Sequence, residues 1–104
     1  MQKGNNLNNT SQTINVTIKS NETYQYNLGA FGDEEGANIT RQAQHYEISS
    51  LKRDSDFVTI NYEYKPSLNY VGTDDVELKS ARGSDGASAN NKIIITTIKF
   101  VIIN

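Results

Sequence analysis

The sequence predicts an all-β fold, a two-sheet sandwich of about seven antiparallel strands. Apolar and polar residues alternate in residues 58–64 and again in residues 74–79, on either side of a turn that contains a proline and a glycine. A period of two gives a strand one face toward a core and one toward water. In addition, no segment of about eleven residues has apolar groups at the three-and-four spacing of a helix.

The first two strands are expected at residues 13–19 and 23–28, which both alternate. They are separated by Ser20 and Asn21, whose side chains favour a turn by bonding to the nearby backbone. We therefore expect these two strands to form a hairpin. Residues 29–37 contain three glycines and three consecutive acidic residues, a composition typical of a loop.

The later strands are separated by equally clear turn signals. Further strands are expected at 38–42, 44–51, 57–64, 74–79 and 92–104, with turns or loops at 52–56, 66–72 and 82–91. The last strand differs from the others because both of its faces are rich in apolar residues. An exposed edge of this composition would promote aggregation. We therefore expect this strand to lie inside a sheet or to be covered by a neighbouring chain.

Length and composition indicate a single small domain. The chain has 104 residues; residues 1–12 are polar and asparagine-rich, which predicts a flexible leader before a sandwich at 13–104. The net charge of -2 gives no basic patch for nucleic acid. Cysteine is absent, which excludes disulfides and thiolate metal sites. The apolar run 93–103 is too short for a transmembrane segment, which needs about 20 residues.

The proline–glycine turn carries a family resemblance. Tyr64-Lys-Pro66 is followed by Tyr70-Val-Gly72-Thr-Asp74, an alternating strand, the loop Arg82-Gly-Ser-Asp-Gly86 and a final β-rich run. In these motifs the chain resembles the immunoglobulin-like and cadherin-like repeats of bacterial surface proteins. As a single copy it is similar to the small adhesins of Bacteroides-type bacteria. The resemblance covers roughly residues 37–103 and implies an immunoglobulin-like sandwich.

The resemblance also implies a function: a non-enzymatic binding or structural module of the bacterial surface, active in cell adhesion. We expect a secreted, periplasmic or lipoprotein form, exported by a signal that precedes this sequence and tethered by the polar leader. The expected partner is a protein or a glycan. It would contact either the loops at 33–36 and 83–90 or a sheet edge by strand addition, and a sheet edge is also where homo-oligomers would form.

The residues of the turn motif have structural interpretations of their own. Pro66 lacks a backbone donor and so is expected to end its strand. Gly72 permits a positive φ where the chain enters the next strand. Tyr70 offers a ring to the edge of the core and a hydroxyl to a loop carbonyl. Asp74 is expected to accept hydrogen bonds from amides of the turn.

The acidic loops contain the only metal candidates. Asp33, Glu35 and Asp85 could supply oxygen ligands to calcium if their loops met at one end of the sandwich. The spacing of an EF-hand is absent, and solvated loop charges are the simpler interpretation. We therefore expect no cofactor, with calcium as the exception to test.

Catalytic residues are not evident. His45 is the only histidine, and a hydrolytic triad would need Ser49, Ser84 or another serine beside it. The glycine-flanked elbow that usually presents such a serine is absent from the sequence. Among the aromatic residues, the tyrosines at 24, 26, 62 and 64 fall on the core-facing parity. Phe31, Phe57 and Tyr46 are left free to be exposed, so they are candidates for stacking on sugars. A carbohydrate- or calcium-binding accessory domain is accordingly the alternative to an adhesion module.

Overall fold

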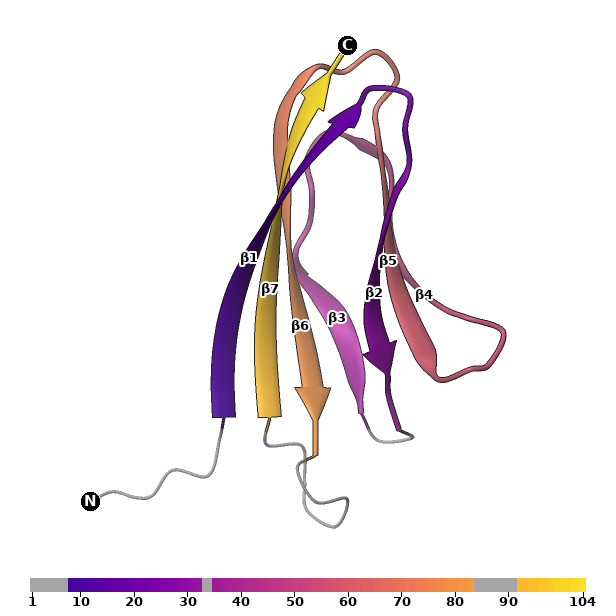
Figure 1. Cartoon of the computed structure of the whole chain (residues 1–104), viewed down its shortest axis with the longest axis vertical. Helices are drawn as coiled ribbons and strands as arrows, with labels where there is room; N and C mark the ends of the chain where they lie inside the picture. Colours follow the sequence, from indigo (N-terminus) through magenta and orange to yellow (C-terminus); the bar gives the residue numbers. More distant parts are fainter. Residues whose placement is uncertain (1–7, 33–34, 84–91) are drawn as a thin grey trace, which may run out of the picture.

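The computed structural model describes residues 8–32, 35–83 and 92–104. These ranges contain seven strands and no helix (Figure 1). The strands are β1 (Asn8–Lys19), β2 (Tyr24–Ala30), β3 (Gly36–Arg41), β4 (Tyr46–Arg53), β5 (Thr59–Pro66), β6 (Gly72–Arg82) and β7 (Lys92–Ile103). With no helix among the described residues, none is long and apolar enough to span a membrane.

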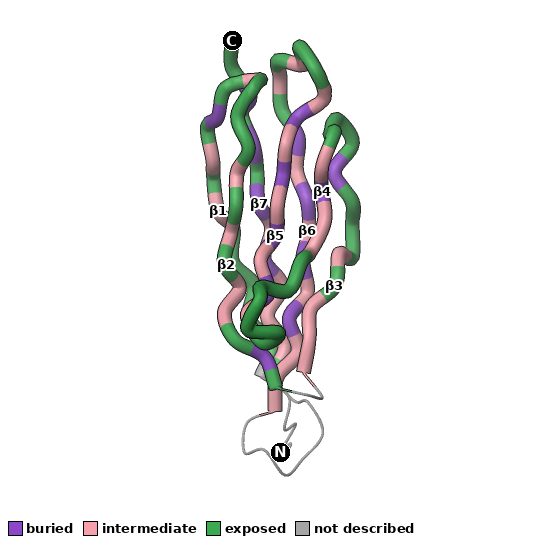
Figure 2. Tube along the Cα trace, turned by 90° about the vertical axis from the view of Figure 1, so that its right-hand side faces the viewer, coloured by how far each residue is buried: buried purple, intermediate pink, exposed green. Residues whose placement is uncertain are grey.

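The strands form two sheets that face each other. One sheet has the order β1-β7-β6-β3 and the other has the order β2-β5-β4. Their inner faces enclose the hydrophobic core, and Figure 2 shows buried and partly exposed residues alternating along β5 and β6. The predicted all-β, two-sheet sandwich of about seven strands is therefore confirmed.

One strand pair departs from the predicted antiparallel arrangement. β1 and β7 run parallel, in register from Asn8 opposite Lys92 to Lys19 opposite Ile103. The turn after β1 leads into the other sheet, so the predicted hairpin of the first two strands is wrong. Alternation along a strand specifies which residues face the core but not which strand lies beside it. Proximity in the sequence was therefore a poor guide to pairing here.

β1 is also longer than predicted. Residues 8–12, assigned from the sequence to a flexible leader, form the first part of this strand and lie opposite residues 92–96 of β7. The amide of Gln12 donates from Nε2 to Thr96 Oγ1 at 3.0 Å, which adds a side-chain contact to the backbone pairing. Polar side chains do not prevent a backbone from pairing. Residues 1–7 lie outside the described residues, so the prediction of a flexible leader stays untested there.

The core is built mainly from β6 and β7 of one sheet and β5 of the other. Its largest fully buried side chains are Tyr62, Tyr64, Phe100, Leu78, Ile98, Ile102, Val76 and Pro66. The Tyr64 and Phe100 rings stack across the two sheets with centroids 3.9 Å apart and an angle of 11°. Burying an apolar side chain of this size contributes about 1.5–3 kcal/mol relative to leaving it exposed. These contacts are consequently the main source of stability.

The two buried tyrosine hydroxyls have polar partners. Tyr62 Oη lies 2.6 Å from Ser49 Oγ, and Tyr64 Oη donates to Asp74 Oδ2 at 2.8 Å. Burial raises the pKa of both hydroxyls above the usual tyrosine value, and the Asp74 carboxylate raises the pKa of Tyr64 further. Both groups are therefore neutral in the folded protein over the ordinary pH range.

β7 lies inside its sheet, between β1 and β6, as predicted from its two apolar faces. Ile98, Phe100 and Ile102 point into the core and are buried. On the outer face, Val101 and Ile103 stay largely exposed. Because β1 occupies one side of β7 and β6 the other, no backbone edge of this apolar strand is open to another chain.

Candidate functional site

Three connections lie at one end of the sandwich (Figure 1). They join β2 to β3, β4 to β5 and β6 to β7, and the register places their flanking residues side by side: Ala30 with Thr59, Gly36 with Ala81, and Arg82 with Lys92. We call this end the loop pole; its described residues are 31–32, 35, 54–58 and 83. The opposite end, the far pole, holds residues 20–23, 42–45 and 67–71 and the carboxyl terminus.

Arg82 links the two sheets at the loop pole. Its guanidinium donates from Nη1 to Ala30 O at 2.7 Å and from Nη2 to Leu28 O at 2.9 Å. It also lies 4.0 Å above the centre of the Phe31 ring, a cation–π distance. Phe31 is only 2% exposed. The prediction that Phe31 is free to stack on a sugar is therefore wrong, because the arginine covers it.

Glu35 joins two of the connections. Its Oε1 accepts from Gly32 N at 2.8 Å and its Oε2 accepts from Gly83 N at 3.0 Å. These backbone bonds, the one from Gly32 first, lower the pKa of the Glu35 carboxyl. The side chain thus acts as a bridge from the β2–β3 connection to the residue that follows β6.

The calcium candidates are only partly described. Asp33 and Asp85 lie outside the described residues, and both oxygens of Glu35 accept amide hydrogens. Within the described ranges, no group of three or more histidine, aspartate or glutamate side chains could hold a metal ion. Calcium binding stays an untested prediction.

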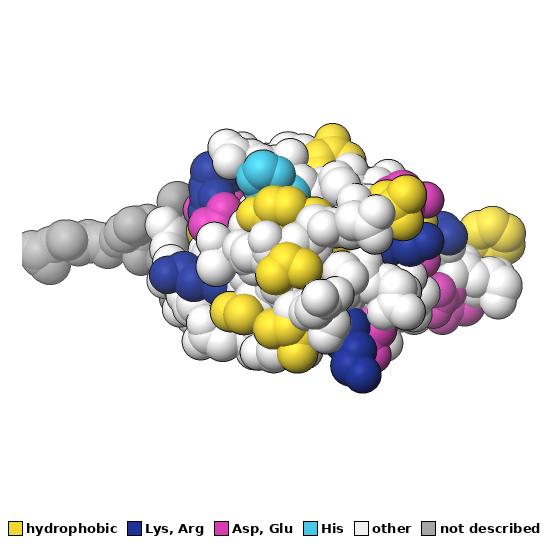
Figure 3. All heavy atoms as spheres, turned by 90° about the horizontal axis from the view of Figure 1, so that it is seen from above, with side chains coloured by type: hydrophobic (Ala, Val, Ile, Leu, Met, Phe, Trp, Pro, Cys, Tyr) yellow, Lys and Arg dark blue, Asp and Glu magenta, His cyan; other side chains and the backbone are white. Residues whose placement is uncertain are grey.

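The β4–β5 connection contributes an exposed aromatic residue. Phe57 is 78% exposed and has a φ of 62°, in the left-handed region. The neighbouring Val58 accepts at its carbonyl oxygen from Phe31 N at 2.9 Å, which joins this connection to the β2–β3 connection. Together with the Glu35 bridge, this bond joins the described residues of the three connections into one surface. In Figure 3 a hydrophobic side chain forms one extremity of the molecule, on the side where Figure 1 shows the β4–β5 connection.

Sequence reasoning identified Phe57 but missed the contacts that unite the loop pole. The sequence placed the start of the strand at residue 57, whereas β5 begins at Thr59 and the turn extends over 54–58. The signal that was available is Asp56, since aspartate side chains bond to the backbone two or three residues on. The Arg82–Phe31 contact had no signal in the sequence, because the two residues are far apart along the chain.

The turn motif lies at the far pole. β5 ends at Pro66, Gly72 has a φ of 148°, and Tyr70 Oη donates to Thr73 O at 2.6 Å. A Cβ on Gly72 would lie 2.8 Å from Tyr70 Oη, so the glycine also makes room for that hydroxyl. The motif therefore supports the β5–β6 connection and lies at the opposite end of β5 from Phe57.

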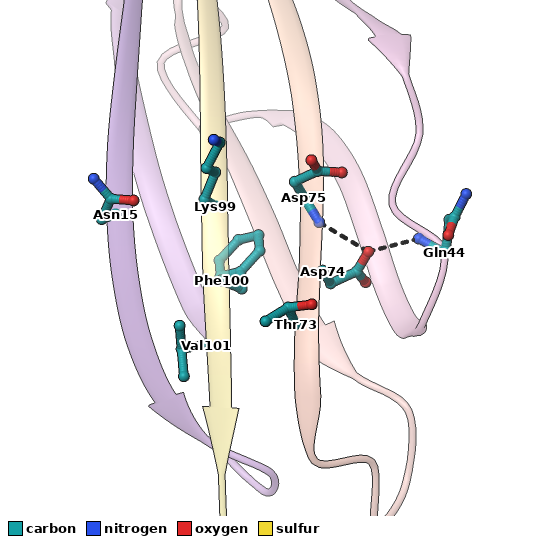
Figure 4. A pocket seen from close by; sticks show the side chains of 8 residues that line it. All are labelled: Asn15, Gln44, Thr73, Asp74, Asp75, Lys99, Phe100 and Val101. Carbon is teal, nitrogen blue, oxygen red and sulfur yellow. Dashed lines mark hydrogen bonds between the residues drawn. The ribbon is translucent and has the colours of Figure 1, made fainter.

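Asp74 is the polar centre of the far pole. Its Oδ1 accepts from the amides of Gln44 and Asp75, both at 2.9 Å, and its Oδ2 accepts from His45 N at 2.9 Å and from the Tyr64 hydroxyl at 2.8 Å. Figure 4 shows its side chain between Asp75 and Gln44. These bonds tie the β3–β4 connection to β6.

The remaining candidate residues do not form a catalytic group. His45 is exposed and stacks on Tyr70 with ring centroids 4.2 Å apart (Figure 3 shows the histidine on the far pole). Ser49 is buried, and its hydroxyl pairs with Tyr62 and Gln42. Ser84 lies outside the described residues. Tyr46 is the first residue of β4, and its side chain is partly exposed.

A hollow of about 390 Å³ opens on the outer side of the β1-β7-β6 surface (Figure 4). It is lined by Asn15, Gln44, Thr73, Asp74, Asp75, Lys99, Phe100 and Val101. Asp75 pairs with Arg41, whose Nη1 lies 2.7 Å from Asp75 Oδ1. Both carboxylate oxygens of Asp74 accept the hydrogen bonds of the far pole described above. The acidic groups of the hollow are therefore engaged in holding the fold.

No protein-family model matches the chain, and no curated protein sequence matches it. Solved structures share its fold. The cysteine protease inhibitor EhICP2 from Entamoeba histolytica is similar over 95% of this chain and 99% of its own, with a TM-score of 0.52 and 18% sequence identity. An endo-fucoidan hydrolase of glycoside hydrolase family 107 has a TM-score of 0.52 and 12% identity over 89% of this chain, but over only 12% of its own length. At such identities the similarity shows the fold alone.

Proposed function

We propose that this domain is a non-enzymatic binding module that recognises a protein partner through the loop pole and serves cell adhesion at a bacterial surface. The observation that carries the proposal is the bonding between the connections at this pole. The bond from Phe31 N to Val58 O and the bridge from Glu35 to Gly83 link the described residues of separate connections. Loops positioned by a rigid sandwich are frequent binding surfaces.

A protein is favoured over other partners by the character of the surface. The pole exposes an aromatic side chain, whereas its charged groups at Glu35 and Arg82 are occupied by internal bonds. The full-length structural neighbour EhICP2 is named as a cysteine protease inhibitor. This makes cysteine proteases the first class of partner to test, beside proteins of the host cell surface.

The absence of enzymatic activity belongs to the same proposal. It is supported by the positions of the groups that a hydrolase would need. His45 stacks on Tyr70 at the surface, and the Ser49 hydroxyl is buried against Tyr62. These two groups were named from the sequence as triad candidates, and among the described residues both are engaged in other contacts.

A carbohydrate-binding or calcium-binding accessory domain is the alternative, favoured by the exposed ring of Phe57, which could stack on a sugar. It predicts binding on a glycan array and a higher melting temperature in millimolar calcium, since a ligand of the folded state stabilises it by mass action. A flat array together with an unchanged melting temperature would eliminate this alternative.

The main test uses the absence of cysteine, which allows a single label to be placed at will. The Ser55→Cys variant carries a polymer at the loop pole, and the Asn21→Cys variant carries the same polymer in the β1–β2 turn at the far pole. Both native residues are exposed in turns. Each protein is assayed by surface binding against papain-type cysteine proteases, fibronectin, collagen, laminin and mucin.

We expect the unlabelled chain to bind at least one of these proteins. The polymer on the Ser55→Cys variant should weaken this binding by about tenfold or more, whereas the polymer on the Asn21→Cys variant should change it by less than about twofold. Binding that is blocked only at the far pole would place the surface at the wrong end. A chain that binds glycans and none of the panel proteins would replace the proposal with the alternative.

A further inference from the structure

Phe57 is an apolar side chain exposed in a strained backbone conformation. A bulky residue rarely has a positive φ, because its Cβ crowds the backbone there. Here φ is 62° and the residue is 78% exposed, so packing of the ring cannot explain the strain. Hydrogen bonds of the turn do: Phe57 N donates to Asp54 O, and Arg53 Nη1 donates to Phe57 O, both at 2.9 Å. The turn therefore imposes the conformation that presents the ring.

Asp56 holds the turn from the other side. Its Oδ1 accepts from the amides of Val58 and Thr59, each at 2.9 Å, and its Oδ2 accepts from Thr59 Oγ1 at 2.7 Å. These bonds, the one from the Thr59 amide first, lower the pKa of the Asp56 carboxyl, so it is ionised at neutral pH. Strain that is overdetermined by its surroundings in this way is typical of functional positions.

The groups around Phe57 favour an apolar pocket over a sugar. Val58 is 41% exposed, so two adjacent apolar side chains form the tip of the connection. The polar groups beside them are already engaged: Asp54 Oδ1 accepts from Asn61 Nδ2 at 2.6 Å, and both oxygens of Asp56 accept bonds within the turn. These bonds take up hydrogen-bonding capacity that the hydroxyls of a sugar would need. An aromatic group within a polar rim is the usual arrangement of a protein–protein hot spot.

We infer that Phe57 is the anchor residue of this domain, whose ring inserts into an apolar pocket of the protein partner. The inference rests on the proposed function, since it places this ring at the centre of the contact made by the loop pole. Because the turn is held before binding, little conformational freedom is lost when the ring is buried. Truncation of such an anchor weakens binding by about 30-fold or more.

The test measures affinity for the panel proteins bound by the unaltered chain. Phe57→Asn removes the ring, and asparagine tolerates a positive φ, so the turn keeps its shape. Asp56→Ala keeps the ring but removes the bonds that hold the turn. Leu68→Asn is the matched control, because Leu68 is 84% exposed and lies in the β5–β6 connection at the far pole. Circular dichroism and thermal melting establish that each variant is folded.

We expect Phe57→Asn to weaken binding by about 30-fold or more and Asp56→Ala by about tenfold, because the ring must then be ordered on binding. Leu68→Asn should change affinity by less than about twofold. Unaltered binding by Phe57→Asn, while the polymer on the Ser55→Cys variant still blocks, would overturn the inference and leave the proposed function standing. If the unaltered chain binds no panel protein, both fail. A dimer of this chain that Phe57→Asn dissociates would also overturn the inference, since the pocket would belong to a second copy.

Discussion

The carboxylate of Asp74 receives four hydrogen bonds inside the far pole, three from backbone amides and one from a tyrosine hydroxyl. It lies one residue before Asp75, which carries the same charge but faces outward and pairs with Arg41. The two aspartates differ in what depends on them. When a buried acceptor is removed, its donors are left without a partner. When an exposed acceptor is removed, its donors can form hydrogen bonds with water instead.

Asp74→Ala should lower the free energy of unfolding by about 3 kcal/mol, because buried donors lose a charged acceptor. Urea unfolding followed by circular dichroism measures this change. Asp75→Ala is the control and should cost less than about 1 kcal/mol, as is usual for an exposed ion pair. Equal losses in the two variants would contradict the central role of Asp74.

The buried tyrosines should limit stability at alkaline pH. Burial raises the pKa of the Tyr62 and Tyr64 hydroxyls above the usual 10.0. In the unfolded chain these hydroxyls ionise at the usual value, whereas in the folded chain they stay protonated to higher pH. Their contribution to the free energy of unfolding is therefore complete below pH 10.0 and is lost as the pH rises above it. We expect the free energy of unfolding to fall in that range, and tyrosinate absorbance to appear together with unfolding.

The control for this effect compares slopes with pH. Tyr64→Phe should reduce the loss of stability per pH unit above pH 10.0, even though it also lowers stability at neutral pH. An equal slope in the unaltered protein and in the Tyr64→Phe variant would show that this hydroxyl does not titrate on unfolding.

Single residues of the site differed in how well the sequence predicted them. Phe57 and Phe31 both follow short polar or glycine-rich stretches, and both were expected to be exposed. Only the first expectation is correct, because Arg82 folds over Phe31 from the end of β6. A contact between residues that distant depends on strand register, which alternation does not encode. The left-handed φ of Phe57 was likewise not predictable from the sequence, because a phenylalanine side chain does not favour that conformation.

At the scale of elements, the strands themselves were predictable. Alternation located β5 and β6 to within a few residues, and the two apolar faces of β7 indicated an interior strand. The pairing of β1 was not predictable, because the first half of this strand is polar and reads as a leader. β7 needs a neighbour on each side, and the chain supplies one of them from its own amino-terminal segment.

Removing the first half of β1 should therefore be costly. Deletion of residues 1–13 takes away the partners of residues 92–97 and should lower the free energy of unfolding by about 3 kcal/mol, at roughly 0.5 kcal/mol or more for each lost backbone bond. The bared edge of β7 is apolar, so we also expect association that increases with concentration. Urea unfolding and analytical ultracentrifugation measure the two effects.

Deletion of residues 1–7 is the matched control, since it removes none of the residues paired in β1. It should leave the free energy of unfolding unchanged and the protein monodisperse. If both deletions had the same small effect, the pairing of residues 8–13 would contribute little to stability.

At the scale of the whole molecule, the two described ends lie at opposite poles (Figure 1). β1 begins at Asn8 at the loop pole, and β7 ends at Ile103 at the far pole. The longest dimension is 50 Å, whereas seven extended residues reach at most about 25 Å. A short linker that joins the start of β1 to a surface would hold the loop pole close to that surface. An attachment after Asn104 would turn it outward.

Binding through the loop pole should therefore depend on how the domain is immobilised. Attached after Asn104, the domain should capture its protein partner more than about tenfold better than when attached directly before Asn8. Surface plasmon resonance with both orientations at equal density measures the difference. Lengthening the amino-terminal linker to about 30 flexible residues should restore capture, because the longer linker lets the loop pole move away from the support. Equal capture in both orientations would contradict a binding surface at this pole.

The parallel pairing of β1 and β7 has a mechanical consequence. These are the first and last strands, and they lie side by side along twelve paired residues. A force that pulls the two ends apart slides one strand against the other, so it is shared by the whole ladder at once instead of opening it bond by bond. A domain that carries load through both of its ends would therefore resist rupture until the ladder fails as a unit.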